Sequence, residues 1–597
     1  MTYKNRNSVF ETIITTLLFL GCLIFFSFFY RYHLLFTEQL QIFLLTFSHF
    51  ISYLSKPAFL ARYAGDFLTQ FYYINGLGAV IITISLSALW LTVRDLLRKA
   101  AGREVHFILP LVPSAFCWIA LCRLDYPLSN IIAIIISVIC TLIYLSIKPA
   151  AVRIIYGIIV TGLLYIIAGS NFYILTAIAI LFELSGENGQ PGKSERVVFP
   201  ILMAGAAIVF PLSLRGMYCL TLNQSLTYLS EMTSRPGLVQ FLPVISLVAV
   251  TAIVLISLKP AAEKPKRKFR DIIQFAVLSA VVVTGLVIEG DFTMEKIMRL
   301  DYEATKSQWE KIYILSSKYN LHNNLSAYYT NLALAKLGRL PDELMRHYQP
   351  VATGLFIPVN ANENFLTITM SNEVYWHLGD VNASQHSALL GMIFSPRAAN
   401  SRLMKRLVEI NIVNGQYAVA EKYIHILEKT MFHRRWAMGM EKFLYNEKEC
   451  SHTGWILQKR IIIPSRDLLK KGNEYIETLR MLADNHPENR MAVDYLLCYH
   501  LLCKDLHSFE YDFDKYYRCT GRKALPETYQ EGLMILIARG ERKPEDYKTC
   551  IFTPSLVKEM REYMDIYVKS NGTGFALREK FGKTYWFYYH FAKMKNE

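Results

Sequence analysis

Two carboxylates stand between the first two long apolar runs of the chain, Glu38 and Asp66. A carboxylate within hydrogen-bond reach of a hydroxyl group can take its proton, so either residue has the chemistry of a catalytic base. Arginines stand beside the apolar runs at Arg31, Arg62, Arg123 and Arg215. Since a guanidinium binds phosphate through two parallel N–H donors, these arginines have the chemistry to hold a lipid phosphate.

A structural interpretation of the same residues is equally simple. Arg62 and Asp66 are four positions apart, so on a helix they share a face and can pair with each other. The other arginines can anchor lipid head groups at the membrane surface. Glu183 is a lone acid inside an apolar run, which makes it a functional candidate by default, although it lies near one end of that run.

Sequence signatures of other chemistries are missing. The chain has no P-loop, no GxSxG, no HExxH and no zinc-ligand spacing, so we expect no metal and no cofactor. Gly76 and Gly78 form a GxG that helix packing in lipid explains better than a nucleotide does. The chain has a net charge of +15, and most Lys and Arg residues of the first 290 positions stand in short loops between apolar runs, where membrane orientation explains them, so we expect no nucleic-acid partner.

The elements that must position these side chains are membrane helices. A helix needs roughly 20 mostly apolar residues to cross a hydrocarbon core of about 30 Å, and such runs fill the first 290 residues. The sequence predicts nine of them, at 10–30, 74–93, 107–122, 130–147, 152–168, 171–185, 198–214, 238–258 and 271–288. Residues 1–290 should therefore form a transmembrane helical domain in contact with membrane lipid.

The orientation follows from the basic residues of the short loops. They gather in alternate loops, beginning with Lys4 and Arg6 and ending with the run KPAAEKPKRKFR at 259–270. Basic loops stay in the cytoplasm, so the N-terminus is expected there. An odd number of spans then places residues 291–597 on the opposite side.

The first loop on that opposite side, residues 31–73, is amphipathic. Leu40, Phe43, Leu44, Phe47, Ile51 and Leu54 recur at helical spacing, which predicts a helix over 38–54 along the membrane surface. Pro57 can start a second helix, over 58–72, that ends in aromatic residues at the interface.

The second half, 291–597, is expected to be all helix. Three segments share a helix, a glycine turn and an apolar residue two positions later, with the glycines at Gly338, Gly379 and Gly415. This pattern resembles the tetratricopeptide repeat, whose stacked helix pairs form concave binding surfaces. A fourth pair over 490–517 and helices near 526–539, 555–569 and 575–594 should continue the stack.

The strings YLSKPAFLARYAGDFLTQFYY, MSNEVYWHLGD, NGQYAVAEKYIHILEKT and ENRMAVDYLLCYHLLCKDL span most of the chain. They resemble an uncharacterised family of bacterial multi-pass inner-membrane proteins, a domain of unknown function. The resemblance implies a transmembrane bundle followed by a periplasmic helical-repeat domain, and it implies no catalytic residue.

Two hypotheses of function follow. In the first, the periplasmic repeats bind a protein or glycan partner in cell-envelope biogenesis. In the second, the chain is similar to C-type membrane glycosyltransferases, whose first outer loop carries an acidic residue and whose donor is a polyprenyl-phosphate sugar. Asp66 or Glu38 would then be catalytic, and Arg31, Arg62, Arg123 and Arg215 would bind the lipid phosphate.

Overall fold

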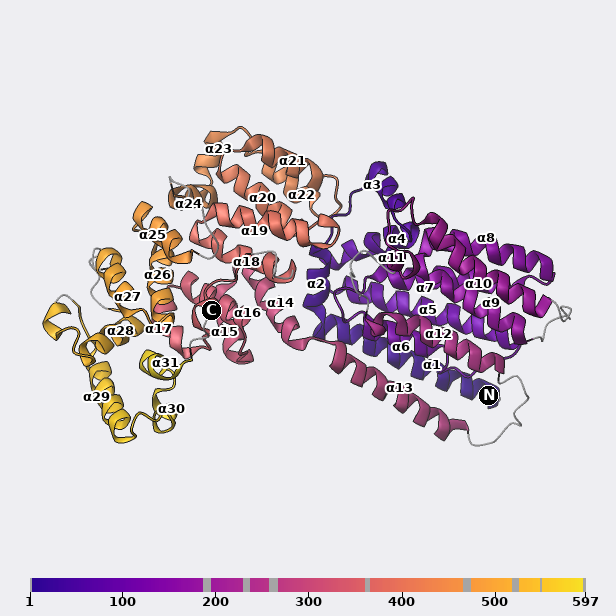
Figure 1. Ribbon diagram of the computed structural model, residues 1–597, viewed down its shortest axis with the longest axis horizontal. Helices are drawn as coiled ribbons and strands as arrows, with labels where there is room; N and C mark the ends of the chain where they lie inside the picture. The colour runs from indigo at the N-terminus through magenta and orange to yellow at the C-terminus, as the bar shows by residue number, and fades with distance from the viewer. Residues whose placement is uncertain are drawn as a thin grey trace. The chain divides into compact units, whose positions relative to one another are not determined.

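The computed structural model describes residues 3–185, 195–228, 237–256, 267–359, 365–464, 474–517, 525–547 and 550–593. The described residues form helices and no strands (Figure 1). The chain divides into two compact units, one of residues 1–295 with 426–435 and one of residues 296–425 with 436–597. Part of the predicted orientation rests on the basic run at 259–270, of which Lys259, Lys264 and Lys266 lie outside the described residues.

The first unit is a bundle of long apolar helices. Its helices are α1 (Tyr3–Ile24), α2 (Arg31–Gln39), α3 (Phe47–Ser52), α4 (Phe59–Thr69), α5 (Leu77–Ala101), α6 (Leu111–Ala120), α7 (Leu128–Ser146), α8 (Ala150–Ala168), α9 (Tyr173–Ser185), α10 (Glu195–Leu214), α11 (Leu222–Leu226), α12 (Leu238–Ile256) and α13 (Arg267–Glu289). Short π- or 3-10 turns are η1 (Phe25–Phe29), η2 (Tyr53–Ser55), η3 (Gln70–Tyr73) and η4 (Gly169–Phe172). Helix α14 (Phe292–Thr305) leads into the second unit.

Seven helices among the described residues are long and apolar enough to cross a membrane. They are Glu11–Phe29, Leu77–Ala101, Leu128–Ser146, Ala150–Ser185, Val197–Leu214, Leu238–Ile256 and Phe269–Glu289. The predicted count of nine is not confirmed. The run at 107–122 contains only the ten-residue α6, about 15 Å long, and the runs at 152–168 and 171–185 fall within one apolar stretch.

Helices α7, α8 and α9 fold back on one another. Arg153 near the start of α8 bonds Glu183 near the end of α9, and Tyr144 near the end of α7 donates its hydroxyl to the same carboxylate. These contacts bring the end of α7, the start of α8 and the end of α9 together. Helices α7 and α9 therefore run in one direction and α8 in the other.

The loop 31–73 differs from the prediction in its first part. Instead of one helix over 38–54, it contains α2 and α3 with a non-helical stretch at 41–45. The apolar spacing there is satisfied without a helix, because Leu40 and Phe43 are buried and the Leu45 N–H donates to the Lys429 carbonyl. The predicted helix over 58–72 is present as α4 and η3.

Glycine allows α4 to lie against α7. A Cβ atom at Gly65 would lie 2.6 Å from the Cα of Ser129, closer than side chains ever approach backbone. Residue 65 must therefore be glycine for the two helices to touch. This contact fixes the face of α4 that carries Arg62 and Asp66.

The second unit consists of shorter helices. They are α15 (Trp309–Tyr319), α16 (Asn324–Lys336), α17 (Leu340–Glu343), α18 (Phe365–Leu378), α19 (Val381–Phe394), α20 (Ser401–Val413), α21 (Tyr417–Leu427), α22 (Arg434–Glu441), α23 (Glu447–His452), α24 (Gly454–Ile462), α25 (Tyr475–Asn485), α26 (Arg490–Leu502), α27 (Leu506–Asp512), α28 (Glu527–Ala538), α29 (Pro554–Lys569), α30 (Phe575–Phe581) and α31 (Tyr585–Phe591). Short turns are η5 (Leu344–Arg346), η6 (Val351–Gly354), η7 (Pro396–Ala398), η8 (Phe513–Tyr517) and η10 (Pro544–Tyr547).

The predicted glycine turns join consecutive helices of this unit. Gly338, Gly379 and Gly415 all have positive φ, between 71° and 92°, a region that favours glycine. At each turn the N–H after the glycine donates to a carbonyl five residues earlier: Arg339 to Leu334, Asp380 to Tyr375 and Gln416 to Asn411. This bond closes the end of the first helix, so the sequence located these turns correctly.

Candidate functional site

Asp66 and Arg62 meet around one tyrosine of the loop 31–73. The hydroxyl of Tyr53 donates to Oδ2 of Asp66 at 2.6 Å, and the guanidinium of Arg62 lies over the Tyr53 ring, 5.3 Å from its centroid. Asp66 is 5% exposed and Arg62 is 4% exposed. The structure therefore brings the candidate base Asp66 and the candidate phosphate-binding residue Arg62 together at the buried ring of Tyr53.

Unsatisfied polar atoms border this place. Ser129 lies directly against α4 at Gly65, and Asn130 follows it at the start of α7. Both are buried, and Ser129 Oγ and Asn130 Oδ1 have no hydrogen-bond partner in the described part of the chain. A buried polar atom of this kind calls for a water molecule or another polar group.

Glu38 is engaged by a histidine from far along the chain. Its Oε1 lies 3.1 Å from Nε2 of His433, and both side chains are less than 8% exposed. Gln41 joins Glu38 to Asp66 indirectly, because its N–H donates to the Glu38 carbonyl and its side-chain amide donates to the Asp66 carbonyl. His433 was not among the residues predicted from the sequence.

Aromatic packing holds this histidine in place. The ring of Phe432 stacks on Tyr73 with centroids 5.2 Å apart and meets Phe71 edge-on at 5.5 Å. His433 itself meets Tyr73 edge-on. Residues 426–435, which comprise the end of α21, the turn after it and the start of α22, belong to the first unit, and these ring contacts join them to it.

The remaining arginines are engaged elsewhere. Arg123 forms two bonds with the carboxylate of Asp125, at 2.9 and 3.1 Å, and a third with Glu289. Nε of Arg215 donates to the Leu220 carbonyl at 3.0 Å. The Arg31 guanidinium donates to the Tyr32 hydroxyl and lies over its ring. Of the four predicted arginines, Arg62 is the one that the structure places beside Asp66.

Arg31 begins a helix that Glu295 caps. The Glu295 carboxylate accepts the N–H groups of Tyr32 at 2.7 Å and His33 at 2.8 Å, which are orphan donors at the start of α2. Burial raises the pKa of Glu295 to about 7, although these bonds and the charge of Arg31 oppose the rise. This carboxylate holds α2, the helix that carries Glu38.

Glu183 is not a lone acid, as the sequence suggested. Arg153 donates from Nε to Oε1 of Glu183 at 2.6 Å and from Nη2 to Oε2 at 2.9 Å. The two side chains are 4% and 3% exposed. Arg153 and Glu183 are 30 residues apart on different helices, so their spacing in the sequence did not indicate that they pair. Glu183 is thus part of a structural ion pair that joins α8 to α9.

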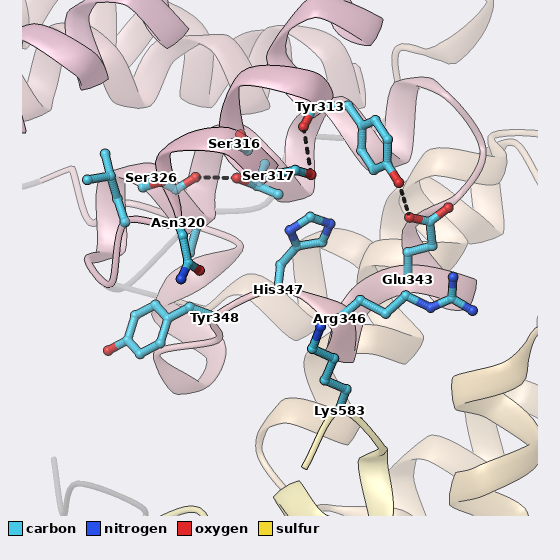
Figure 2. A pocket seen from close by; sticks show the side chains of 13 residues that line it. Tyr313, Ser316, Ser317, Asn320, Ser326, Glu343, Arg346, His347, Tyr348 and Lys583 are labelled. Atoms are coloured by element: carbon cyan, nitrogen blue, oxygen red, sulfur yellow. Dashed lines mark hydrogen bonds between the residues drawn. The ribbon is translucent and has the colours of Figure 1, made fainter. Parts of the chain in front are cut away.

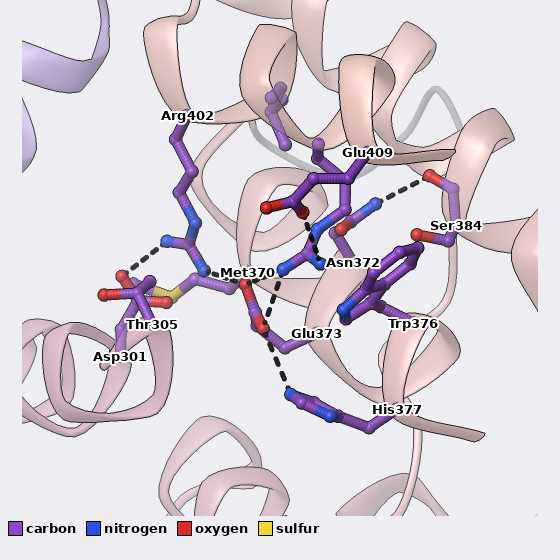
Figure 3. Close-up of polar contacts among 12 residues, drawn as sticks. Asp301, Thr305, Met370, Asn372, Glu373, Trp376, His377, Ser384, Arg402 and Glu409 are labelled. Carbon is purple, nitrogen blue, oxygen red and sulfur yellow. Dashed lines mark hydrogen bonds and ion pairs between the residues drawn. The ribbon is translucent and has the colours of Figure 1, made fainter. Parts of the chain in front are cut away.

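A second buried charge network lies in the helical unit (Figure 3). Arg402 on α20 bonds both Asp301, at 2.7 Å, and Glu373 on α18, at 2.9 Å. Arg406, one turn later, bonds Glu373 at 3.2 Å and Glu409 at 3.0 Å. Burial favours a neutral Glu373, but the two arginines outweigh it and hold its pKa well below the usual range.

A polar cavity of about 400 Å³ opens in the same unit (Figure 2). Its walls come from α15, α16, the turn after α17 and the segment between α30 and α31. The side chains that line it include Tyr313, Ser316, Asn320, Arg346, His347, Tyr348 and Lys583. This lining offers aromatic faces, hydroxyl and amide groups, and cations around one space.

Residues 6–592 match the family described as "Family of unknown function (DUF6057)". The chain belongs to this family. No curated protein and no solved structure matches it. Membership in DUF6057 confirms the expected resemblance to an uncharacterised family and names no functional residue.

Proposed function

We propose that this DUF6057 protein is a bacterial inner-membrane protein whose helical unit lies in the periplasm and binds a glycan in cell-envelope biogenesis. The apolar helices of the first unit support anchorage in the membrane. The basic bias of alternate loops supports a cytoplasmic N-terminus. The polar cavity of the helical unit is the observation that carries the proposal.

The helix pairs of this unit are degenerate tetratricopeptide-like repeats in our proposal. The shared glycine turns support it, since Gly338, Gly379 and Gly415 close three helix ends with the same backbone bond. Side-chain caps support it too: Asn323, Asp380 and Asn400 each accept an N–H at the start of a helix. Stacked pairs of this kind make hollows between helices, and the cavity is one such hollow.

The cavity suits a sugar better than an apolar ligand. Ligand pockets of drug-like molecules are mostly apolar, whereas this one is lined chiefly by hydroxyl, amide and charged groups. The Tyr348 ring, 40% exposed, stacks on His322 with the planes 2° apart and presents an aromatic face to the solvent. Aromatic faces with convergent hydroxyl and amide groups match the alternating C–H and O–H surfaces of a sugar ring.

Binding of defined oligosaccharides tests this function. The full chain in lipid nanodiscs is titrated by calorimetry with a panel of neutral and acidic oligosaccharides. We expect a saccharide to bind, with Tyr348→Ala weakening it about fivefold or more, as the loss of one aromatic contact implies. Tyr511→Ala, at an exposed tyrosine outside the cavity, serves as the control and should bind as the wild type does. A panel that does not bind, or equal binding by both variants, would overturn the proposal.

A second candidate function rests on Asp66 and Arg62. Their meeting at Tyr53, beside the unsatisfied Ser129 and Asn130, favours a C-type glycosyltransferase in which Asp66 takes a proton and Arg62 binds a polyprenyl phosphate. Glu38 is the other candidate base, with His433 at its carboxylate as the Tyr53 hydroxyl is at that of Asp66. Arg31, Arg123 and Arg215, like Arg62 over the Tyr53 ring, would exchange present contacts for the donor phosphate.

Sugar transfer by purified protein separates the two functions. Wild type and Asp66→Asn are incubated with radiolabelled polyprenyl-phosphate sugars, and transfer to an added glycan is counted. The transferase function expects transfer that Asp66→Asn abolishes while helix content stays unchanged. Absence of transfer by the wild type, with glycan binding retained, would leave the binding function and remove the transferase.

A further inference from the structure

One end of the cavity in the helical unit is positively charged. Arg346, His347 and Lys583 converge there, and Figure 2 shows Lys583 reaching from another part of the chain to a position below Arg346. Glu343 is the acid of the lining, so the fixed charges are two cations and one anion, 2 − 1 = +1. The lining therefore carries a net charge of +1, which favours a ligand with one negative charge.

The contacts of these groups show which of them remain available to a ligand. Glu343 accepts the Tyr313 hydroxyl at 2.9 Å and lies near Arg339, so local partners already satisfy it. Arg346 reaches Glu527 at 3.0 Å through one nitrogen, with both side chains about half exposed. An exposed pair of this kind holds little free energy, so Arg346 can turn to an incoming anion at small cost.

His347 stands between these charges. Burial lowers its pKa, and the nearby Lys583 and Arg346 lower it further, while Glu343 acts in the opposite direction. The Tyr313 ring meets the imidazole edge-on at 5.9 Å. An anion beside His347 would cancel the effect of the two cations and favour the protonated imidazole.

The opposite wall of the cavity offers groups for hydroxyls. Ser316 lines the cavity, is 5% exposed, and its Oγ has no hydrogen-bond partner among the described residues. Asn320 has a left-handed backbone conformation, and Figure 2 shows its amide in the space between Ser326 and Tyr348. A buried hydroxyl without a partner is costly, so a rotation of the Ser316 side chain toward a ligand hydroxyl in the cavity would remove that cost.

We propose that this cavity binds a sugar residue that carries a carboxylate, a hexuronic acid, with the carboxylate at Arg346, His347 and Lys583 and the ring hydroxyls at Ser316 and Asn320. This inference rests on the glycan-binding function proposed above and names its ligand class. A single carboxylate matches the lining charge of +1, whereas a phosphate monoester brings nearly two negative charges.

Matched sugar pairs test the ligand class. Dissociation constants of the full chain in nanodiscs are measured by saturation-transfer NMR at pH 7 for methyl glucuronide against methyl glucoside, and methyl galacturonide against methyl galactoside. Sodium acetate and inorganic phosphate are titrated as anions without a sugar. We expect one uronide to bind at least about fivefold more tightly than its neutral partner, and more tightly than either free anion.

Variants assign the effect to the cavity. Lys583→Ala should bring the uronide close to the affinity of the neutral sugar, while Lys558→Ala, at an exposed lysine of α29, should leave both unchanged. If the uronide and its neutral partner bind equally well, the proposed uronide ligand is overturned, while the glycan-binding function is retained. If neither the uronide nor the neutral sugar binds, both the uronide ligand and the glycan-binding function are overturned. If inorganic phosphate binds more tightly than the uronide, the cavity binds a phosphate and not a carboxylate.

A pH series gives an independent readout. The uronide carboxylate stays ionised above about pH 5, and His347 is the histidine among the residues that line the cavity. A second histidine, His322, stacks on the Tyr348 ring, so the His347→Gln variant is needed to assign the effect. Because the bound anion raises the pKa of His347, binding takes up a proton, and affinity should increase as the pH falls from 8 to 5.5. His347→Gln should remove this increase, and a wild type whose affinity is independent of pH would contradict the placement of the carboxylate.

Discussion

Nε2 of His433 lies 3.1 Å from Oε1 of Glu38, although 395 residues separate them in sequence. The pair ties residues 426–435, which come from between two helices of the C-terminal half, to the loop that follows the first membrane helix. The Leu45 N–H strengthens this tie by donating to the Lys429 carbonyl at 2.8 Å. The loop that carries Asp66 is thus held in part by a distant segment of the chain.

Removing His433 should loosen that segment. His433→Ala leaves the buried Glu38 carboxylate without its bond, at a cost of about 1–3 kcal/mol. We expect amide hydrogen exchange over 426–435 to become at least about tenfold faster, since 1.4 kcal/mol corresponds to a factor of ten. His452→Ala, at an exposed histidine that bonds its own helix, should leave exchange unchanged. Unchanged exchange in His433→Ala would mean that the pair contributes nothing.

The Arg153–Glu183 pair should be essential to the membrane bundle. Arg153→Met leaves a buried carboxylate uncompensated, which costs about 3–5 kcal/mol, so the unfolding temperature in detergent should fall by several degrees. The double variant Arg153→Met/Glu183→Leu should recover most of the loss, because no charge then remains buried. Arg98→Met, at a half-exposed arginine, is the control. A double variant no more stable than the single one would contradict this account.

Glu373 should make the helical unit sensitive to acid. Its pKa is lowered in the folded state, so its contribution to stability is present above the unfolded value of 4.5 and is lost as the pH falls toward the folded value. At pH 7, Glu373→Gln should lower the unfolding free energy by about 3–5 kcal/mol, because Arg402 and Arg406 lose their shared partner.

The difference between Glu373→Gln and wild type should narrow in urea titrations below pH 4.5. Glu562→Gln, at an exposed acid paired with Lys580, should change stability by about 0.5 kcal/mol or less at every pH. A difference between Glu373→Gln and wild type that is independent of pH would show that the carboxylate acts through its shape and not its charge.

The proposed orientation, with the N-terminus in the cytoplasm and the helical unit in the periplasm, can be tested by cysteine labelling. In intact cells, a membrane-impermeant maleimide should label Lys558→Cys in the helical unit and should not label Glu104→Cys in the loop after α5, in a background where all native cysteines are serine. Glu104 is exposed, so its lack of labelling would reflect its side of the membrane. Labelling at Glu104 alone would invert the orientation and remove the periplasmic role.

The sequence predicted those features that depend on neighbouring residues. Gly338, Gly379 and Gly415 were correctly placed in turns, because a glycine after an apolar helical stripe is a local signal for a helix end. The helix predicted over 58–72 from Pro57 is present from Phe59, directly after Ala58, whose backbone is left-handed. Both residues of the Arg62–Asp66 group lie on that one helix, so their meeting was also predictable.

Features that depend on distant residues were not predictable. Glu38 contacts His433, and Glu183 contacts Arg153, only because the chain folds. The spacing of these residues along the sequence does not predict either contact. The helix over 38–54 was wrong because apolar residues at helical spacing can also be buried by a non-helical segment, as Leu40 and Phe43 are. The cavity could not be predicted from the sequence, because Lys583 lies close to residues 313–348 only in the folded structure.

A cryo-electron density map of the full chain in nanodiscs with a saturating uronic-acid oligosaccharide tests the central claim most directly. The account predicts sugar density in the cavity, with a carboxylate within hydrogen-bond distance of Lys583 or Arg346 and a hydroxyl at Ser316. Density for the sugar at another site, with this cavity filled by ordered water alone, would contradict it.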